Sequence, residues 1–136
     1  MMPRWPLRCA IRQLPTHLIV CLLVLTAACD GDAERTIARS ELVNVRFLLD
    51  QGARVVRLDA APGVRINARL QPVLELDDGT HVAFASDSIT ADSSYFTGSP
   101  RALLATVRAR RGILRASACP ATVLGCRSIT LDVVLP

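Results

Sequence analysis

The sequence predicts an all-β domain, folded as an antiparallel sandwich of about seven or eight short strands. From Glu41 onward, apolar and polar residues alternate with a period of two, the pattern of strands with one buried face. Residues that favour turns, mainly glycine, proline and aspartate, separate these runs at short intervals. No segment shows a firm helical pattern. Together these observations favour two packed antiparallel sheets over a mixed fold.

The first predicted strands form a hairpin. Val43, Val45 and Phe47 alternate with polar residues in the segment 41–50, and residues 53–58 form the second strand. Gln51-Gly52 provides the turn between them. After this hairpin, residues 60–63 contain proline followed by glycine, a combination typical of a turn.

The next strand, residues 64–71, has the clearest alternation in the sequence. Proline cannot donate a ladder hydrogen bond, so at Pro72 the strand ends, contains a bulge or lies at a sheet edge. Residues 73–76 and 81–84 flank Asp77-Asp78-Gly79-Thr80. An Asp-Gly pair between apolar runs is the strongest short signal of a β-hairpin.

The last third of the sequence predicts a long surface loop followed by three strands. Residues 85–100 are rich in serine, threonine, aspartate, glycine and proline, and they contain Tyr95-Phe96. Residues 101–110 read as a strand, with a helix starting at Ala102 as the alternative. A turn at Arg111-Gly112 then precedes strands at 113–119 and 128–135.

A secretory leader precedes this domain. Three arginines come before an apolar run at 18–28, and small residues stand directly before Cys29. The run is shorter than the ~20 residues that a membrane-spanning helix needs. Leu25-Thr26-Ala27-Ala28-Cys29 resembles the lipobox of bacterial lipoproteins, although Thr26 stands where leucine is more usual.

This resemblance implies that residues 1–28 are removed and that Cys29 carries acyl chains such as palmitate. Several acyl chains hold a protein firmly to a membrane. The polar residues 29–40 would then form a lipidated tether, followed by the β-sandwich domain at 41–136. The implied location is the periplasmic face of a bacterial membrane. Asp30 after the acylated cysteine slightly favours the inner membrane, by the rule of enterobacterial lipoproteins.

The charge of the chain does not indicate binding to nucleic acid. The net charge of the whole sequence is +4, but three of the sixteen basic residues lie in the leader and all twelve acidic residues follow it. The mature chain therefore carries a charge near +1. A high isoelectric point that arises from a leader is no basis for a nucleic-acid partner.

Two cysteines remain for the folded domain. Of the five cysteines, Cys9 and Cys21 lie in the leader and Cys29 is the predicted acylation site, which leaves Cys119 and Cys126. An exported protein experiences an oxidising compartment, where such a pair forms a disulfide. As a structural cross-link, the bond closes a short loop and contributes about 2–3 kcal/mol. As a redox pair, it exchanges with the thiols of a partner.

Three segments resemble the N-terminal periplasmic domain of the thiol:disulfide interchange protein DsbD and its relatives. Residues 61–68 match its Pro-Gly-x-x-Ile-Asn-Ala strand start, and residues 94–98 look like its loop of aromatic residues and glycine. The redox hairpin of that domain is similar to the C-terminal part of this chain, which consists of residues 112–119, a short loop, Cys126 and a final apolar strand. Six residues separate the two cysteines here, where relatives have four or five, and Arg127-Ser128 replaces the prolines that often follow.

The resemblance implies an immunoglobulin-like sandwich that passes electrons between a thioredoxin-like domain and periplasmic acceptors. Cys119 and Cys126 would be its redox pair, and Tyr95 or Phe96 would shield the pair as an aromatic cap. The alternative for these two aromatic residues is packing in the core beneath a loop.

The remaining candidates point to a solvated surface more than to a catalytic site. Arg46, Arg57, Arg65 and Arg69 either form a solvated outer face, with acidic residues such as Asp59 and Glu75 nearby, or bind anionic headgroups or an acidic partner. His81 follows a hairpin turn, no serine lies in a nucleophile elbow, and the histidine and cysteines are too few for a zinc site. Neither a metal nor a cofactor is predicted.

The predicted function is therefore that of a membrane-anchored lipoprotein that binds or scaffolds an unidentified envelope protein. Cys119 and Cys126 would form its structural disulfide. Thiol:disulfide exchange, with a thioredoxin-like domain as the partner, is the alternative.

Overall fold

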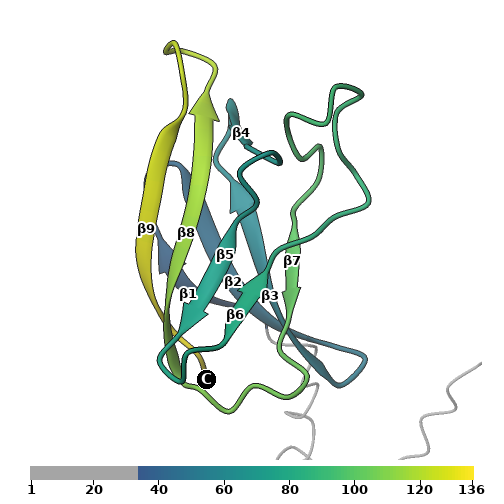
Figure 1. The fold of residues 1–136 in the computed structure, drawn as a ribbon, viewed down its shortest axis with the longest axis vertical. Helices are drawn as coiled ribbons and strands as arrows, with labels where there is room; N and C mark the ends of the chain where they lie inside the picture. The colour runs from purple at the N-terminus through teal and green to yellow at the C-terminus, as the bar shows by residue number, and fades with distance from the viewer. Residues whose placement is uncertain (1–33) are drawn as a thin grey trace, which may run out of the picture. The chain divides into compact units, whose positions relative to one another are not determined.

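The computed structural model describes residues 34–136, which form an antiparallel β-sandwich (Figure 1). The predicted fold class is confirmed: the described residues form strands and no helix, and none of them belongs to a helix that could cross a bilayer. The predicted leader, the acylation site at Cys29 and the first part of the tether lie outside the described residues. The strands are β1 (Arg35–Arg39), β2 (Val43–Asp50), β3 (Ala53–Ala60), β4 (Val64–Ile66), β5 (Val73–Leu76), β6 (His81–Ala83), β7 (Arg101–Leu103), β8 (Arg111–Pro120) and β9 (Arg127–Val134).

The first sheet has the strand order β1-β2-β3-β7. Its centre is the predicted hairpin of β2 and β3, which pair without interruption from Val43–Ala60 to Asp50–Ala53. Gln51 and Gly52 have φ values of 50° and 81°. Positive φ at both central residues is typical of the two-residue turns that match the twist of a hairpin.

The second sheet is organised around β8, its longest strand. One edge of β8 pairs with β9, and the other pairs with β4 near one end and with β5 near the other end. β6 extends the sheet beyond β5 through the hairpin of residues 77–80, as the sequence predicts. Gly79 has a φ of 83°, and the Asp78 carboxylate accepts a hydrogen bond from the Thr80 amide.

The core lies between the two sheets and consists of the alternating apolar residues that the sequence predicts. Val45, Phe47, Val56 and Leu58 face inward from the first sheet. The second sheet and the adjoining segments contribute the buried side chains of Leu74, Phe84, Leu104, Leu114, Ile129 and Val133.

The predicted tether extends too far into the domain, because residues 35–39 form the strand β1. Arg35 pairs with Phe47 and Arg39 with Asn44, with a bulge between Thr36 and Ala38. Ile37 and Ala38 are half-buried against the core. The bulge interrupts the period-two pattern, so this short segment reads as irregular in the sequence.

Two predicted strands are shorter than expected, and one predicted turn is part of a strand. The strand predicted at 64–71 ends at Ile66, because the Asn67 side chain accepts hydrogen bonds from the amides of Arg69 and Leu70 and forms a turn. β7 ends at Leu103, and the alternative helix from Ala102 is absent from the described chain. Arg111-Gly112 does not form a turn but begins β8.

The sandwich has two distinct ends, which we name by their residues. The disulfide end contains the β3–β4 turn and the β8–β9 turn, joined by the hydrogen bond from Ala121 N to Gly63 O. The arginine end contains the β2–β3 turn, the β5–β6 turn, residues 104–110 and residues 134–136, joined by backbone bonds such as Leu104 N to Arg54 O and Leu135 N to Arg110 O. In Figure 1 the β8–β9 turn stands at the top and Pro136 near the bottom.

Candidate functional site at the disulfide end

The predicted disulfide between Cys119 and Cys126 is confirmed. The two cysteines face each other one step beyond the Ala118–Arg127 pair, at the end of the β8–β9 ladder. Cys119 lies in β8 and is only 5% exposed, whereas Cys126 precedes β9 and is exposed. The bond therefore joins a buried cysteine to an exposed one.

The turn that the disulfide closes carries apolar side chains into solvent. Val123 is 41% exposed, and Leu124 is as exposed as in an extended chain, at 105%. Gly125 has a φ of 89°, a left-handed conformation that glycine adopts without strain. These two apolar side chains at the tip of a cross-linked hairpin are accessible to a partner.

Residues from β4 and its extension line the hairpin beside the disulfide. Arg65 pairs with Cys119 across the β4–β8 ladder, and its guanidinium lies 4.1 Å from the centre of the Tyr95 ring. The amide Nδ2 of Asn67 is 4.0 Å from Cys126 Sγ, and the Asn67 backbone bridges to Tyr95. Asn67 is not among the site residues predicted from the sequence, although the alternation of residues 64–71 places it on the same face as Arg65.

The two candidate cap residues have different surroundings. Tyr95 is half-buried and stacks with Arg65, so it lies at the disulfide end. Phe96 packs against the hydrophobic core, and its amide donates to Ile66 O. Phe96 thus has the packing role that the sequence offered as the alternative.

The loop of residues 85–100 is held to the disulfide end by hydrogen bonds. Ala68 N donates to Ser94 O, and Arg69 Nη2 donates to Asp92 O at 3.1 Å. Within the loop, hydrogen bonds from the Thr90 hydroxyl and from Ser94 lower the pKa of Asp92 to about 2. A charged Asp92 therefore organises the segment that brings Tyr95 to Arg65.

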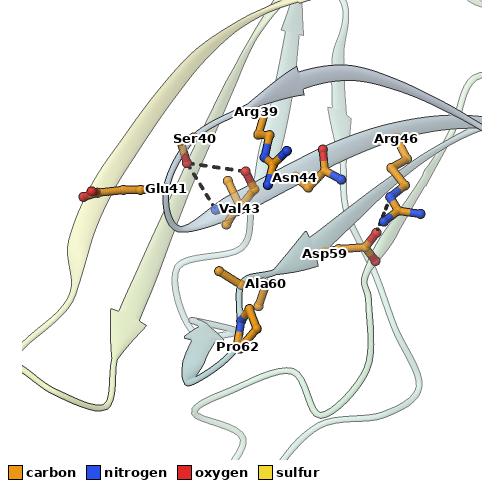
Figure 2. A pocket seen from close by; sticks show the side chains of 10 residues that line it. Arg39, Ser40, Glu41, Val43, Asn44, Arg46, Asp59, Ala60 and Pro62 are labelled. Carbon is orange, nitrogen blue, oxygen red and sulfur yellow. Dashed lines mark hydrogen bonds and ion pairs between the residues drawn. The ribbon is translucent and has the colours of Figure 1, made fainter.

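Two open pockets flank Asp59 near the disulfide end. The first, of about 550 Å³, lies between the β1–β2 turn and the end of β3 (Figure 2). Arg39 and Asn44 line it, and Asn44 Oδ1 is buried without a hydrogen-bond partner among the described residues. The second, of about 530 Å³, includes Arg65 and Phe96 in its lining. Both are open surface hollows lined by polar and apolar groups, with room for side chains of a partner.

Asp59 is the centre of an ion-pair network on the outer face of the first sheet. Its carboxylate contacts Arg57 Nε at 3.0 Å and accepts a hydrogen bond from the Ser99 hydroxyl at 2.5 Å. Arg46 Nε lies 3.1 Å from Asp59 Oδ2 as an ion pair, although its geometry is not that of a hydrogen bond (Figure 2). Burial raises the pKa of Asp59, but the bonds from Ser99 and Arg57 and the charge of Arg46 outweigh it, so the pKa is lowered.

The predicted arginine face is therefore not a free cationic surface. Arg46 and Arg57 pair with Glu34 and Asp59, Arg65 stacks on Tyr95, and Arg69 binds the backbone of Asp92. This agrees with the interpretation of a solvated outer face with acidic residues nearby.

The described residues contain no arrangement that suggests catalysis by a metal or by histidine. Between residues 34 and 136, no three histidine, cysteine or acidic side chains are grouped to hold a metal ion. His81 is exposed in β6. The disulfide end therefore offers its sulfur–sulfur bond and the exposed Val123-Leu124 pair.

A comparison of the chain with protein-family models, with curated proteins and with solved structures finds no match.

Proposed function

We propose that this chain is an acylated envelope lipoprotein whose β-sandwich binds a protein partner through the disulfide end. Cys29 would carry the lipid, and the Cys119–Cys126 bond would be a structural cross-link. The leader, the lipobox-like residues 25–29 and the confirmed disulfide support export to an oxidising compartment. The observation that carries the binding function is the exposed Val123-Leu124 pair on a cross-linked turn.

The unequal burial of the two sulfurs favours a structural bond. In exchange, a thiolate of the partner would attack the exposed Cys126 Sγ, and the electron pair of the broken bond would pass to Cys119 Sγ. Cys119 is 5% exposed, and among the described residues no hydrogen bond reaches its sulfur. A buried thiolate without a donor is costly, so this step is disfavoured.

Thiol:disulfide exchange remains the second candidate, because Cys126 is an exposed residue and has Asn67 Nδ2 beside its sulfur. A thioredoxin-like domain is the class of partner that the resemblance to DsbD suggests. Titration of the purified mature protein against a glutathione couple separates the two functions. A structural bond has a potential below about −300 mV, whereas an exchanging bond equilibrates at a higher potential.

A photoreactive amino acid at Leu124 tests the binding function in cells. We expect a discrete cross-linked adduct from Leu124 and none from Thr80, an exposed residue in the β5–β6 turn at the other end of the sandwich. Adducts at equal yield from both positions would contradict binding through the disulfide end. Mass spectrometry of the same material tests the anchor, because an acylated Cys29 must be the first residue.

A further inference from the structure

The described chain begins close to the arginine end of the sandwich. β1 starts at Arg35, opposite Phe47, and runs toward the disulfide end, where Arg39 pairs with Asn44. Arg35, Thr36 and Ile37 line a small pocket together with residues 134–136 of the arginine end. The preceding residue, Glu34, forms ion pairs with Arg46 and Arg57 on the outer face of the first sheet.

A lipid on Cys29 would keep this part of the domain near the bilayer. Five residue steps separate Cys29 from Glu34, and they span at most about 18 Å when fully extended. The distance along β2 from Phe47 to its first residue, Val43, is already about 13 Å, and the β8–β9 turn lies beyond that point, where Ala121 binds Gly63. The arginine end is well within the reach of the tether, whereas the tip at Leu124 is at or past its limit.

The arginine end also has the charge that a bilayer of anionic phospholipid attracts. Arg35, Arg108, Arg110 and Arg111 are exposed, and none of them pairs with a carboxylate of the described residues. Asp50 at this end is paired with Arg101. Glu75, which lies in the same row of the sheet as Asp132, is paired with Arg115. The remaining acidic residues here are Asp77 and Asp78 in the β5–β6 turn and Asp132 in β9.

Exposed apolar side chains accompany these arginines. Leu49 is 45% exposed, Leu103 is 57% exposed and Val134 is 59% exposed. A surface that combines basic and large apolar residues binds the interfacial region of a membrane through both electrostatic attraction and apolar burial. At the disulfide end, by contrast, Arg65 and Arg69 are already engaged and Arg127 pairs with Glu41. Arg39, toward that end, is exposed and is neither engaged by such a contact nor paired with a carboxylate of the described residues, whereas four such arginines lie at the arginine end.

We propose that the arginine end is a membrane-facing surface, with Arg35, Arg108, Arg110 and Arg111 against anionic phospholipid headgroups. This inference rests on the acylation of Cys29 in the proposed function. It assigns an orientation to the anchored domain: the arginine end lies on the bilayer, and the disulfide end points away from it toward a partner.

Hydrogen exchange of the acylated mature protein in vesicles tests this orientation. We expect the amides of residues 49–54 and 104–111 to exchange more slowly on vesicles with phosphatidylglycerol than on vesicles of phosphatidylcholine alone. The amides of residues 120–126 should exchange equally on both. Salt at 1 M should remove most of the difference, because it shortens the screening length to about 3 Å.

Two triple variants provide the comparison. Arg108→Gln/Arg110→Gln/Arg111→Gln should lose the selective protection, and Arg65→Gln/Arg69→Gln/Arg127→Gln, at the other end, should keep it. Exchange of the β2 and β8 amides in detergent confirms that each variant is folded. Protection of residues 120–126 instead, or equal exchange on the two kinds of vesicle, would overturn the orientation while leaving the anchor intact. A mass that shows Cys29 without acyl chains would overturn both proposals.

Discussion

At the scale of single residues, Asp59 shows how a charged side chain stabilises the outer face of the sandwich. It contacts Arg46 and Arg57 from neighbouring strands and the Ser99 hydroxyl from the long loop. Ion pairs at a protein surface contribute little on their own. Here one carboxylate joins β2, β3 and the loop of residues 85–100, so its loss affects three segments together.

We predict that Asp59→Asn lowers the free energy of unfolding by about 1 kcal/mol or less at pH 7. The pKa of Asp59 in the folded state lies below its ordinary value of 3.8. The stabilisation is therefore complete above the unfolded value, near pH 4, and is lost as the pH falls through the lower folded value. Urea unfolding of parent and variant at pH 7 and pH 3 measures the difference, which should shrink at pH 3.

Asp132→Asn is the matched control, because Asp132 is exposed and forms no ion pair within the described residues. It should change the unfolding free energy much less than Asp59→Asn at either pH. If the two variants behaved alike, the contacts of Asp59 would have no measurable role in stability.

The pairing of Cys119 with Cys126 could be predicted from the sequence, but the contacts of the residues that surround the disulfide in the fold could not. Cys119 and Cys126 could be identified because the predicted leader and the predicted acylation site account for the other cysteines. The specific contacts of Asn67 and Asp59 could not be predicted in the same way, since they depend on which strands become adjacent. Only the register of β4 against β8 brings Arg65 and Asn67 beside the disulfide.

At the scale of elements, Gly112 permits the close approach of β8 to β5. A Cβ atom at this position would lie 2.7 Å from Glu75 O and 3.0 Å from a methyl group of Leu76. We predict that Gly112→Ala lowers the free energy of unfolding by about 1–3 kcal/mol, because the strands must separate or bend to accommodate the methyl group. Thermal unfolding measures this loss.

The disulfide should stabilise the β8–β9 hairpin, by an amount that depends on the short length of the loop that it closes. We predict that Cys119→Ala/Cys126→Ala lowers the free energy of unfolding by about 2–3 kcal/mol. Urea unfolding of the parent with and without a strong reductant is an independent check, and it should give a loss of similar size. A loss near zero in both measurements would be inconsistent with a structural cross-link and would favour exchange.

Elements with regular alternation were predictable, and elements defined by distant partners were not. The β2–β3 and β5–β6 hairpins follow from local pattern and turn residues. The short strands β4 and β7 end where side-chain and loop contacts replace the ladder, as Asn67 does after Ile66. β1 was missed because its bulge disrupts the alternation, although its partner β2 is the next strand in the chain.

At the scale of the whole molecule, the two ends of the sandwich have different compositions. The disulfide end combines a cross-linked apolar turn, an Arg65–Tyr95 stack and two open pockets. The arginine end combines basic residues without carboxylate partners and exposed leucines. In our proposals, the arginine end attaches to the membrane and the disulfide end binds the partner. The two ends are separated by the length of β8, about 30 Å.

The position of β1 sets the boundary of the folded domain, which the sequence placed at residue 41. We predict that a shortened chain that starts at residue 41 is less stable by about 2 kcal/mol than one that starts at residue 34. The shorter chain lacks the apolar burial of Ile37 and Ala38, which stabilises by about this amount. It also leaves the edge of β2 unpaired, and an open edge of eight residues promotes association between chains. Urea unfolding measures the stability difference and light scattering the association. If both chains unfolded at the same urea concentration and remained monomeric, residues 34–40 would belong to the tether. The folded domain would then begin at Glu41, in the β1–β2 turn near the disulfide end. The tether would in that case join the domain at the disulfide end, and not near the arginine end.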